Sequence, residues 1–164
     1  MPDDTDNEPG DRRWRSWETL QNIFDDMGEF RRSPEGQQLQ AEEQAAEAGL
    51  QTWLADQPGV VVGRHGGLVP EQWEGEVDGH SFYFRERGGD WDIELDLQQG
   101  REHGGFRGDL IATGTIATEG YGANPRERAA FIVTTIRNHL RRTRVTEIAR
   151  TVAERSAELN HRLS

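Results

Sequence analysis

The alternation of apolar and polar residues between Trp73 and Leu97 constrains the fold of this 164-residue chain more than any other feature. Two dipeptides interrupt it, Asp78-Gly79 and Gly88-Gly89. Both are typical of two-residue β-hairpin turns, because those positions require positive φ. Alternation with a period of two places successive side chains on opposite faces of a strand. We therefore predict three antiparallel strands joined by two tight turns.

Two-residue turns also fix which residues of the three strands lie opposite one another. All the large apolar side chains then share one face, which a slip of one residue would not give. The rows predicted on that face are Trp73–Phe84–Ile93, Gly75–Phe82–Leu95 and Val77–His80–Leu97. The rows predicted on the other face are Glu74–Tyr83–Glu94, Glu76–Ser81–Asp96 and the pair Arg85–Asp92.

The segments on either side of this meander add helices and further strands. Ser33 before Pro34 is typical of a capped helix start, and apolar spacing predicts another helix before it. Residues 60–62 and 110–117 are typical of strands, and Asn124 begins a helix that faces the sheet. The polar run RTRVT predicts a break before a last helix at 145–163. We predict an α+β fold, with an antiparallel β-meander of three to five strands backed by a C-terminal helix, two N-terminal helices and a last C-terminal helix.

Four segments follow from this order of elements. They are a disordered acidic tail at 1–11, an N-terminal helical segment at 12–57, an α+β core at 58–142 and a C-terminal amphipathic helix at 143–164.

Composition excludes several kinds of chemistry. The chain has no cysteine, which excludes disulfides and thiolate catalysis, and all 19 of its basic residues are arginine. Without lysine it can form neither a Schiff base nor a Walker-type phosphate loop. Lysine codons are AT-rich, so this composition suggests a GC-rich genome. No apolar run is long enough to span a membrane, and the acidic N-terminus does not resemble a signal peptide. We expect a soluble cytoplasmic protein with no cofactor and no membrane partner.

The net charge of −11 is unevenly distributed. Residues 1–100 carry 23 acidic residues against 8 arginines, whereas residues 101–164 carry 7 acidic residues against 11 arginines. The acidic part repels nucleic acid, while the C-terminal part attracts anionic surfaces.

The polar face of the meander gathers four carboxylates around a tyrosine and a serine. Such a group is able to bind a divalent cation through oxygen ligands, or to supply an acid–base pair assisted by Tyr83 or by His103 of a glycine-rich loop. The alternative, which we favour, is the solvated outer side of a half-covered sheet. The weak candidate metal ligands are Glu74, Glu76, Glu94 and Asp96.

The predicted C-terminal helices carry a second face beside the one directed at the sheet. It places a phenylalanine between arginines and continues into aliphatic residues, a composition typical of a partner contact. The predicted partner-binding residues are Arg128, Phe131, Thr135, Asn138, Arg142, Val145, Val152 and Leu159. Alternatively, the last helix folds back on the N-terminal helices and buries its apolar residues within one chain.

The start of the helix at Asn124 offers free backbone N–H groups, so Asn124, Arg126 and Arg128 are candidates for anion binding. The order helix, three strands, helix resembles that of double-stranded-RNA-binding domains over about half the chain. In that fold a phosphate clamp lies where this sequence has Asn124, Arg126 and Arg128, although the clamp lysines are absent. Nucleic-acid binding, as an alternative function, would use the C-terminal arginines Arg126, Arg128, Arg137, Arg141, Arg142 and Arg144.

Among these readings we favour a small, acidic, non-enzymatic interaction protein that binds a protein partner, or itself, through its C-terminal helices. Accessory proteins of this kind are common in phage and mobile-element genomes. An enzyme that uses the carboxylate face and a nucleic-acid-binding domain are the alternatives.

Overall fold

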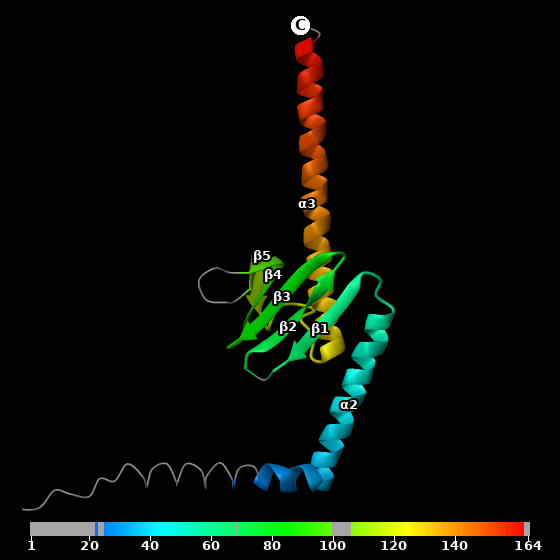
Figure 1. Cartoon of the computed structure of the whole chain (residues 1–164), viewed down its shortest axis with the longest axis vertical. Coiled ribbons are helices and arrows are strands. Elements are labelled where there is room, and N and C mark those ends of the chain that lie inside the picture. Colours follow the sequence, from blue (N-terminus) through cyan, green and yellow to red (C-terminus); the bar gives the residue numbers. More distant parts are fainter. Residues whose placement is uncertain (1–21, 23–24, 68, 100–105, 163–164) are drawn as a thin grey trace, which may run out of the picture. The chain divides into compact units, whose positions relative to one another are not determined.

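The computed structural model describes residues 22, 25–67, 69–99 and 106–162 (Figure 1). Residues 25–32 are helical, and a five-stranded antiparallel sheet lies between helices α2 and α3 in the sequence. The predicted α+β fold with a meander and two N-terminal helices is confirmed. The elements are α2 (Pro34–Ala55), β1 (Val60–Gly66), β2 (Glu71–Val77), β3 (His80–Arg87), β4 (Asp90–Gln99), β5 (Phe106–Thr115) and α3 (Pro125–Arg162).

The chain divides into two units, Met1–Ala45 and Ala46–Ser164. In the first unit, Ser33 separates the helical residues 25–32 from α2. Its Oγ accepts a hydrogen bond from the Gly36 amide at 3.1 Å, which is the predicted cap. Met27, Phe30 and Leu39 are exposed. The predicted tail at 1–11 lies outside the described residues.

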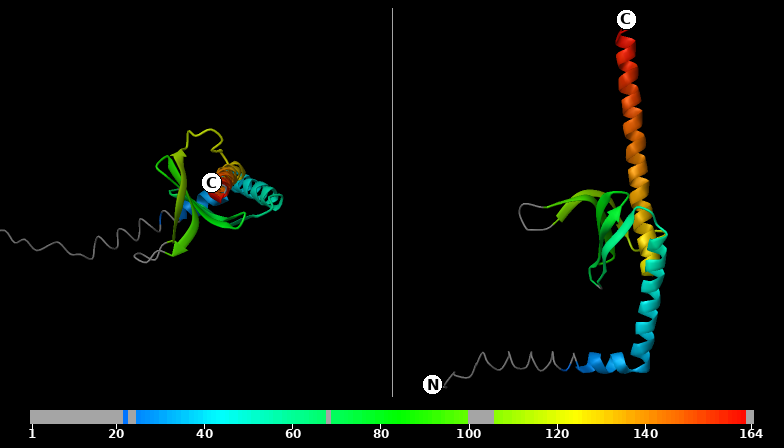
Figure 2. Two further views of the ribbon diagram at one scale, coloured as in Figure 1. Left: turned by 90° about the horizontal axis from the view of Figure 1, so that it is seen from above. Right: turned by 45° about the vertical axis from the view of Figure 1, so that its right-hand side comes forward.

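In the second unit, the strands pair in the order β1-β2-β3-β4-β5. The predicted pairs Trp73–Phe84, Gly75–Phe82, Phe84–Ile93 and Phe82–Leu95 are all present. This face of the sheet is buried, and α3 lies across it (Figure 2). The core combines the sheet residues with one side of α3 and the last turns of α2; its buried members include Leu50, Trp73, Phe82, Phe84, Ile93, Leu95, Ile132 and Ile136.

The predicted register fails beyond Leu95, because Asp96 has a left-handed backbone with φ of 54°. The strand irregularity turns the Asp96 carboxylate to His80, whose Nδ1 lies 2.9 Å from Asp96 Oδ1. The Leu97 amide donates to Ser81 Oγ at 2.8 Å. His80 is therefore a half-exposed residue paired with a carboxylate, and not the core histidine that strict alternation predicts.

Helix α3 is continuous from Pro125 to Arg162, so the predicted break at RTRVT is wrong. The hydroxyls of Thr143 and Thr146 accommodate this polar run, because each donates to the backbone carbonyl one turn earlier, that of His139 and that of Arg142. The predicted boundary between 142 and 143 thus lies inside one helix. Among the described residues, no helix is both long enough and apolar enough to cross a bilayer.

Candidate functional site

The first turns of α3 are fixed to the sheet by the buried side chain of Arg128. Its guanidinium donates to the carbonyls of Tyr121 and Gly122 at 2.8 Å, to the Tyr121 hydroxyl at 2.6 Å and to the Glu71 carboxylate at 2.5 Å. It also lies 3.4 Å from the centroid of the Tyr121 ring. Because these donors are already engaged within the chain, Arg128 stabilises the fold. The prediction that it binds a partner or an anion is therefore wrong.

Phe131 is partly buried and packs against the core. Its ring packs edge-on against Trp91 at 5.0 Å and Tyr121 at 5.6 Å, measured between ring centroids. These aromatic residues come from β4 and from the connection before α3, so they extend the core around the side of the helix. The fully exposed ring that the sequence predicts at Phe131 is therefore not found. Thr135 is half-buried and bonds the Phe131 carbonyl, while Asn138 and Arg142 are exposed.

The second half of α3 extends beyond the sheet, and its side chains are exposed all around the helix. From Arg141 to Arg162 all side chains are exposed. Four of them are large aliphatic residues, with 56 to 62 % of their surface exposed. We call these four, Val145, Ile148, Val152 and Leu159, the apolar row. Three of the four recur every seven residues and Ile148 lies one turn from Val145, so the row follows one side of the helix.

The apolar row lies among charged residues with an excess of arginine. Residues 141–162 carry six arginines and three glutamates. Arg150 and Glu154 form a loose ion pair at 3.9 Å along the helix. An exposed pair of this kind contributes little to stability. This half of α3 is thus a cationic helix with an uncovered aliphatic side.

The four carboxylates proposed as metal ligands do not converge. Glu94 accepts a hydrogen bond from the Gly108 amide at 2.8 Å, Asp96 turns to His80, and Glu74 lies 3.9 Å from Arg64. Glu76 is exposed. Within the described part of the chain, no three histidine or acidic side chains are grouped as metal ligands. Burial raises the pKa of Tyr83 and that of Asp92 on this face. His103 lies outside the described residues.

The helix start proposed as an anion site already holds a carboxylate. The Glu127 amide donates to Asn124 Oδ1 at 3.0 Å, and the Ala123 amide donates to Glu127 Oε2 at 2.8 Å. This arrangement resembles a capping box, except that the glutamate accepts from the amide of Ala123, one residue before the Asn124 cap. Arg126 is exposed. The local sequence Asn-Pro-Arg-Glu is typical of this cap.

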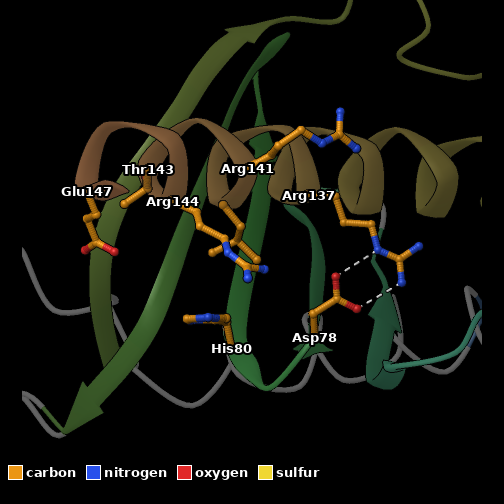
Figure 3. A pocket seen from close by; sticks show the side chains of 8 residues that line it. Asp78, His80, Arg137, Arg141, Thr143, Arg144 and Glu147 are labelled. Atoms are coloured by element: carbon orange, nitrogen blue, oxygen red, sulfur yellow. Dashed lines mark hydrogen bonds and ion pairs between the residues drawn. The ribbon is translucent and has the colours of Figure 1, made fainter. Parts of the chain in front are cut away.

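A crevice of about 670 Å³ lies between the β2–β3 turn and α3 (Figure 3). At one end, Arg137 donates two hydrogen bonds of 3.0 Å to the Asp78 carboxylate and one of 2.7 Å to the Pro58 carbonyl. The hydrogen bonds between Arg137 and Asp78 lower the pKa of Asp78 and raise the pKa of Arg137. The residues that line the crevice are Asp78, His80, Arg137, Leu140, Arg141, Thr143, Arg144 and Glu147. Sequence reasoning missed this site, because nothing local indicates that the turn meets α3.

Comparison with protein-family models, with curated protein sequences and with solved structures finds no match to this chain.

Proposed function

We propose that this protein is a non-enzymatic interaction module that binds a helical segment of another chain along the apolar row of α3. The observation that carries the proposal is the exposure of Val145, Ile148, Val152 and Leu159 on the half of α3 that lies beyond the core. Most helical stability in proteins comes from packing of an apolar side against a neighbour rather than from the helix propensity of the residues. A partner that covers the row would supply that packing.

The energetic gain from such packing is substantial. Covering a valine, leucine or isoleucine contributes about 1.5–3 kcal/mol, before the entropic cost of association is subtracted. Spacing of seven residues suits a coiled-coil contact, in which the side chains insert between those of a second helix. The arginine excess around the row favours a partner helix that carries acidic residues.

The test compares two neighbouring substitutions on the same helix. Val152→Glu places a charge in the apolar row, whereas Thr151→Glu places the same charge beside it, at another exposed position. The tagged wild-type chain and both variants are recovered from host lysate, and co-purifying proteins are quantified by mass spectrometry. Sedimentation velocity of each purified chain measures self-association.

We expect one partner, or a second copy, to be retained by the wild type and by Thr151→Glu and to be lost from Val152→Glu. Equal retention by all three chains would show that the row is not the contact. A wild type that neither self-associates nor retains any protein would contradict the proposal itself.

A further inference from the structure

We propose that the crevice between the β2–β3 turn and α3 is a binding site for phosphate monoesters of about the size of a nucleotide. The site is independent of the apolar row. It is built by the hairpin residues Asp78 and His80 on one side and by the α3 segment from Arg137 to Glu147 on the other. Its volume of about 670 Å³ is within the usual range for small-molecule sites.

The cations of the crevice differ in how far their charge is already neutralised. Arg137 is paired with the Asp78 carboxylate, and its Nη2 also donates to the Pro58 carbonyl. Arg144, in contrast, has no hydrogen bond or ion pair with any described residue, and Arg141 makes only a 3.4 Å bond to the neutral Asn138 side chain. The crevice therefore holds two arginines that have no carboxylate partner among the described residues, and an anionic ligand would satisfy them.

Arg144 and His80 face each other across the crevice. Figure 3 shows Arg144 extending from α3 toward His80, while Arg141 extends from the other edge of the helix. Asp96 holds Nδ1 of His80 at 2.9 Å, which orients the ring and leaves Nε2 as its remaining polar atom. An anion between the two elements would accept from the Arg144 guanidinium on one side and, when the His80 ring carries both protons, from His80 Nε2 on the other.

The chemistry of the lining favours a phosphate monoester over other anions. A phosphate offers three acceptor oxygens, enough for two N–H groups of the Arg144 guanidinium and for His80 Nε2, whereas a carboxylate offers two. The crevice is larger than a phosphate ion, and the half-buried Leu140 contributes an apolar surface for the body of the ester. Glu147, at the opposite end from Asp78, is able to accept a hydrogen bond from a ligand hydroxyl.

The test uses isothermal titration calorimetry with AMP, adenosine and inorganic phosphate on the full chain. Arg144→Gln removes the central cation, and Arg155→Gln is the matched control, because Arg155 is an exposed arginine of α3 outside the crevice. We expect AMP to bind more tightly than adenosine or phosphate, with affinity reduced about tenfold or more by Arg144→Gln and unchanged by Arg155→Gln.

Both variants alter exposed residues, so the fold is expected to persist, and circular dichroism verifies it. Amide chemical shifts of His80 and Arg144 that move on addition of AMP would support the assignment to this crevice. No binding of AMP at millimolar concentration, equal binding of adenosine, or equal weakening by Arg144→Gln and Arg155→Gln would each overturn it.

Discussion

At the scale of single residues, Arg128 joins three parts of the second unit. It connects α3 to the Tyr121–Gly122 segment before it and to Glu71 of β2. Glu71 in turn accepts a hydrogen bond from the Trp73 indole at 2.7 Å. A buried arginine is tolerated here because each of these bonds replaces one that the side chain makes with water.

Arg128→Leu tests this role. The substitution leaves the Tyr121 and Gly122 carbonyls and the half-buried Glu71 carboxylate without their donor, so we expect the free energy of unfolding to fall by about 2–4 kcal/mol. Arg126→Leu, at an exposed position two residues earlier, is expected to cost less than about 0.5 kcal/mol. Urea unfolding followed by tryptophan fluorescence measures both. Equal costs would mean that the buried bonds contribute nothing specific.

Two aspartates are expected to affect stability in opposite directions as the pH changes. Hydrogen bonds from Arg137 lower the pKa of Asp78, so its contribution is present above the ordinary value and is lost as the pH falls through the lowered folded pKa. Burial raises the pKa of Asp92, so its ionisation opposes folding and stability is lost as the pH rises through the raised pKa.

Asp78→Asn is therefore expected to lower the free energy of unfolding at neutral pH, by less than about 1 kcal/mol because the ion pair is exposed. Asp92→Asn is expected to raise it at the same pH. Below about pH 3, where both carboxyls are largely protonated in the unfolded chain, the two differences from the wild type should diminish. Urea unfolding across this pH range measures them; differences of the same sign at neutral pH would contradict the argument.

At the scale of elements, α3 consists of two halves with different neighbours. Its first half contributes Ala129, Ile132, Val133 and Ile136 to the core, and its second half is exposed throughout.

Phe131, in the first half, packs edge-on against Trp91 and Tyr121, so Phe131→Ala is expected to destabilise the fold by about 2–4 kcal/mol. Val152→Glu is expected to change the unfolding midpoint little in the absence of a partner. Comparable destabilisation by both would show that the second half of α3 packs on the chain after all.

The sequence predicts the centre of the sheet well, because alternation and tight turns are local signals. The pairs Glu74–Tyr83 and Arg85–Asp92 follow from the turns alone, and both are present. The register fails at Asp96 because a left-handed backbone at an aspartate has no local signature as clear as glycine. The environment of Phe131 was not predictable, since its neighbours Trp91 and Tyr121 reach it only through the tertiary fold. The apolar row, in contrast, was visible as periodicity.

At the scale of the whole molecule, the absence of lysine makes trypsin a selective probe, because it cleaves only after arginine. The exposed arginines Arg31 and Arg32 in the first unit and those from Arg141 onward in α3 lie outside the buried core. Arg64, Arg85 and Arg87 lie within paired strands, which must open before a protease can bind them. We expect trypsin to cleave early after the arginines outside the core and late after those within paired strands. Mass spectrometry of the fragments over time measures the order of cleavage.

A bound partner should slow cleavage in α3 without changing cleavage after Arg31 and Arg32. Early cleavage after Arg85 or Arg87 would contradict the assignment of β3 to a stable sheet.

Because α3 is one continuous helix, it fixes both the distance of the apolar row from the sheet and the direction in which the row points. A helix rises 1.5 Å and turns about 100° per residue, so the distance from the sheet to Leu159 and the direction in which the apolar row points are both set by a count of residues. Seven residues inserted after Arg142 would move the row outward by about 10 Å and keep its direction nearly unchanged. Two inserted residues would turn it about 200°, to the opposite side of the helix. A partner that must also touch the sheet or the crevice would tolerate neither insertion, while a partner held by the row alone would tolerate both.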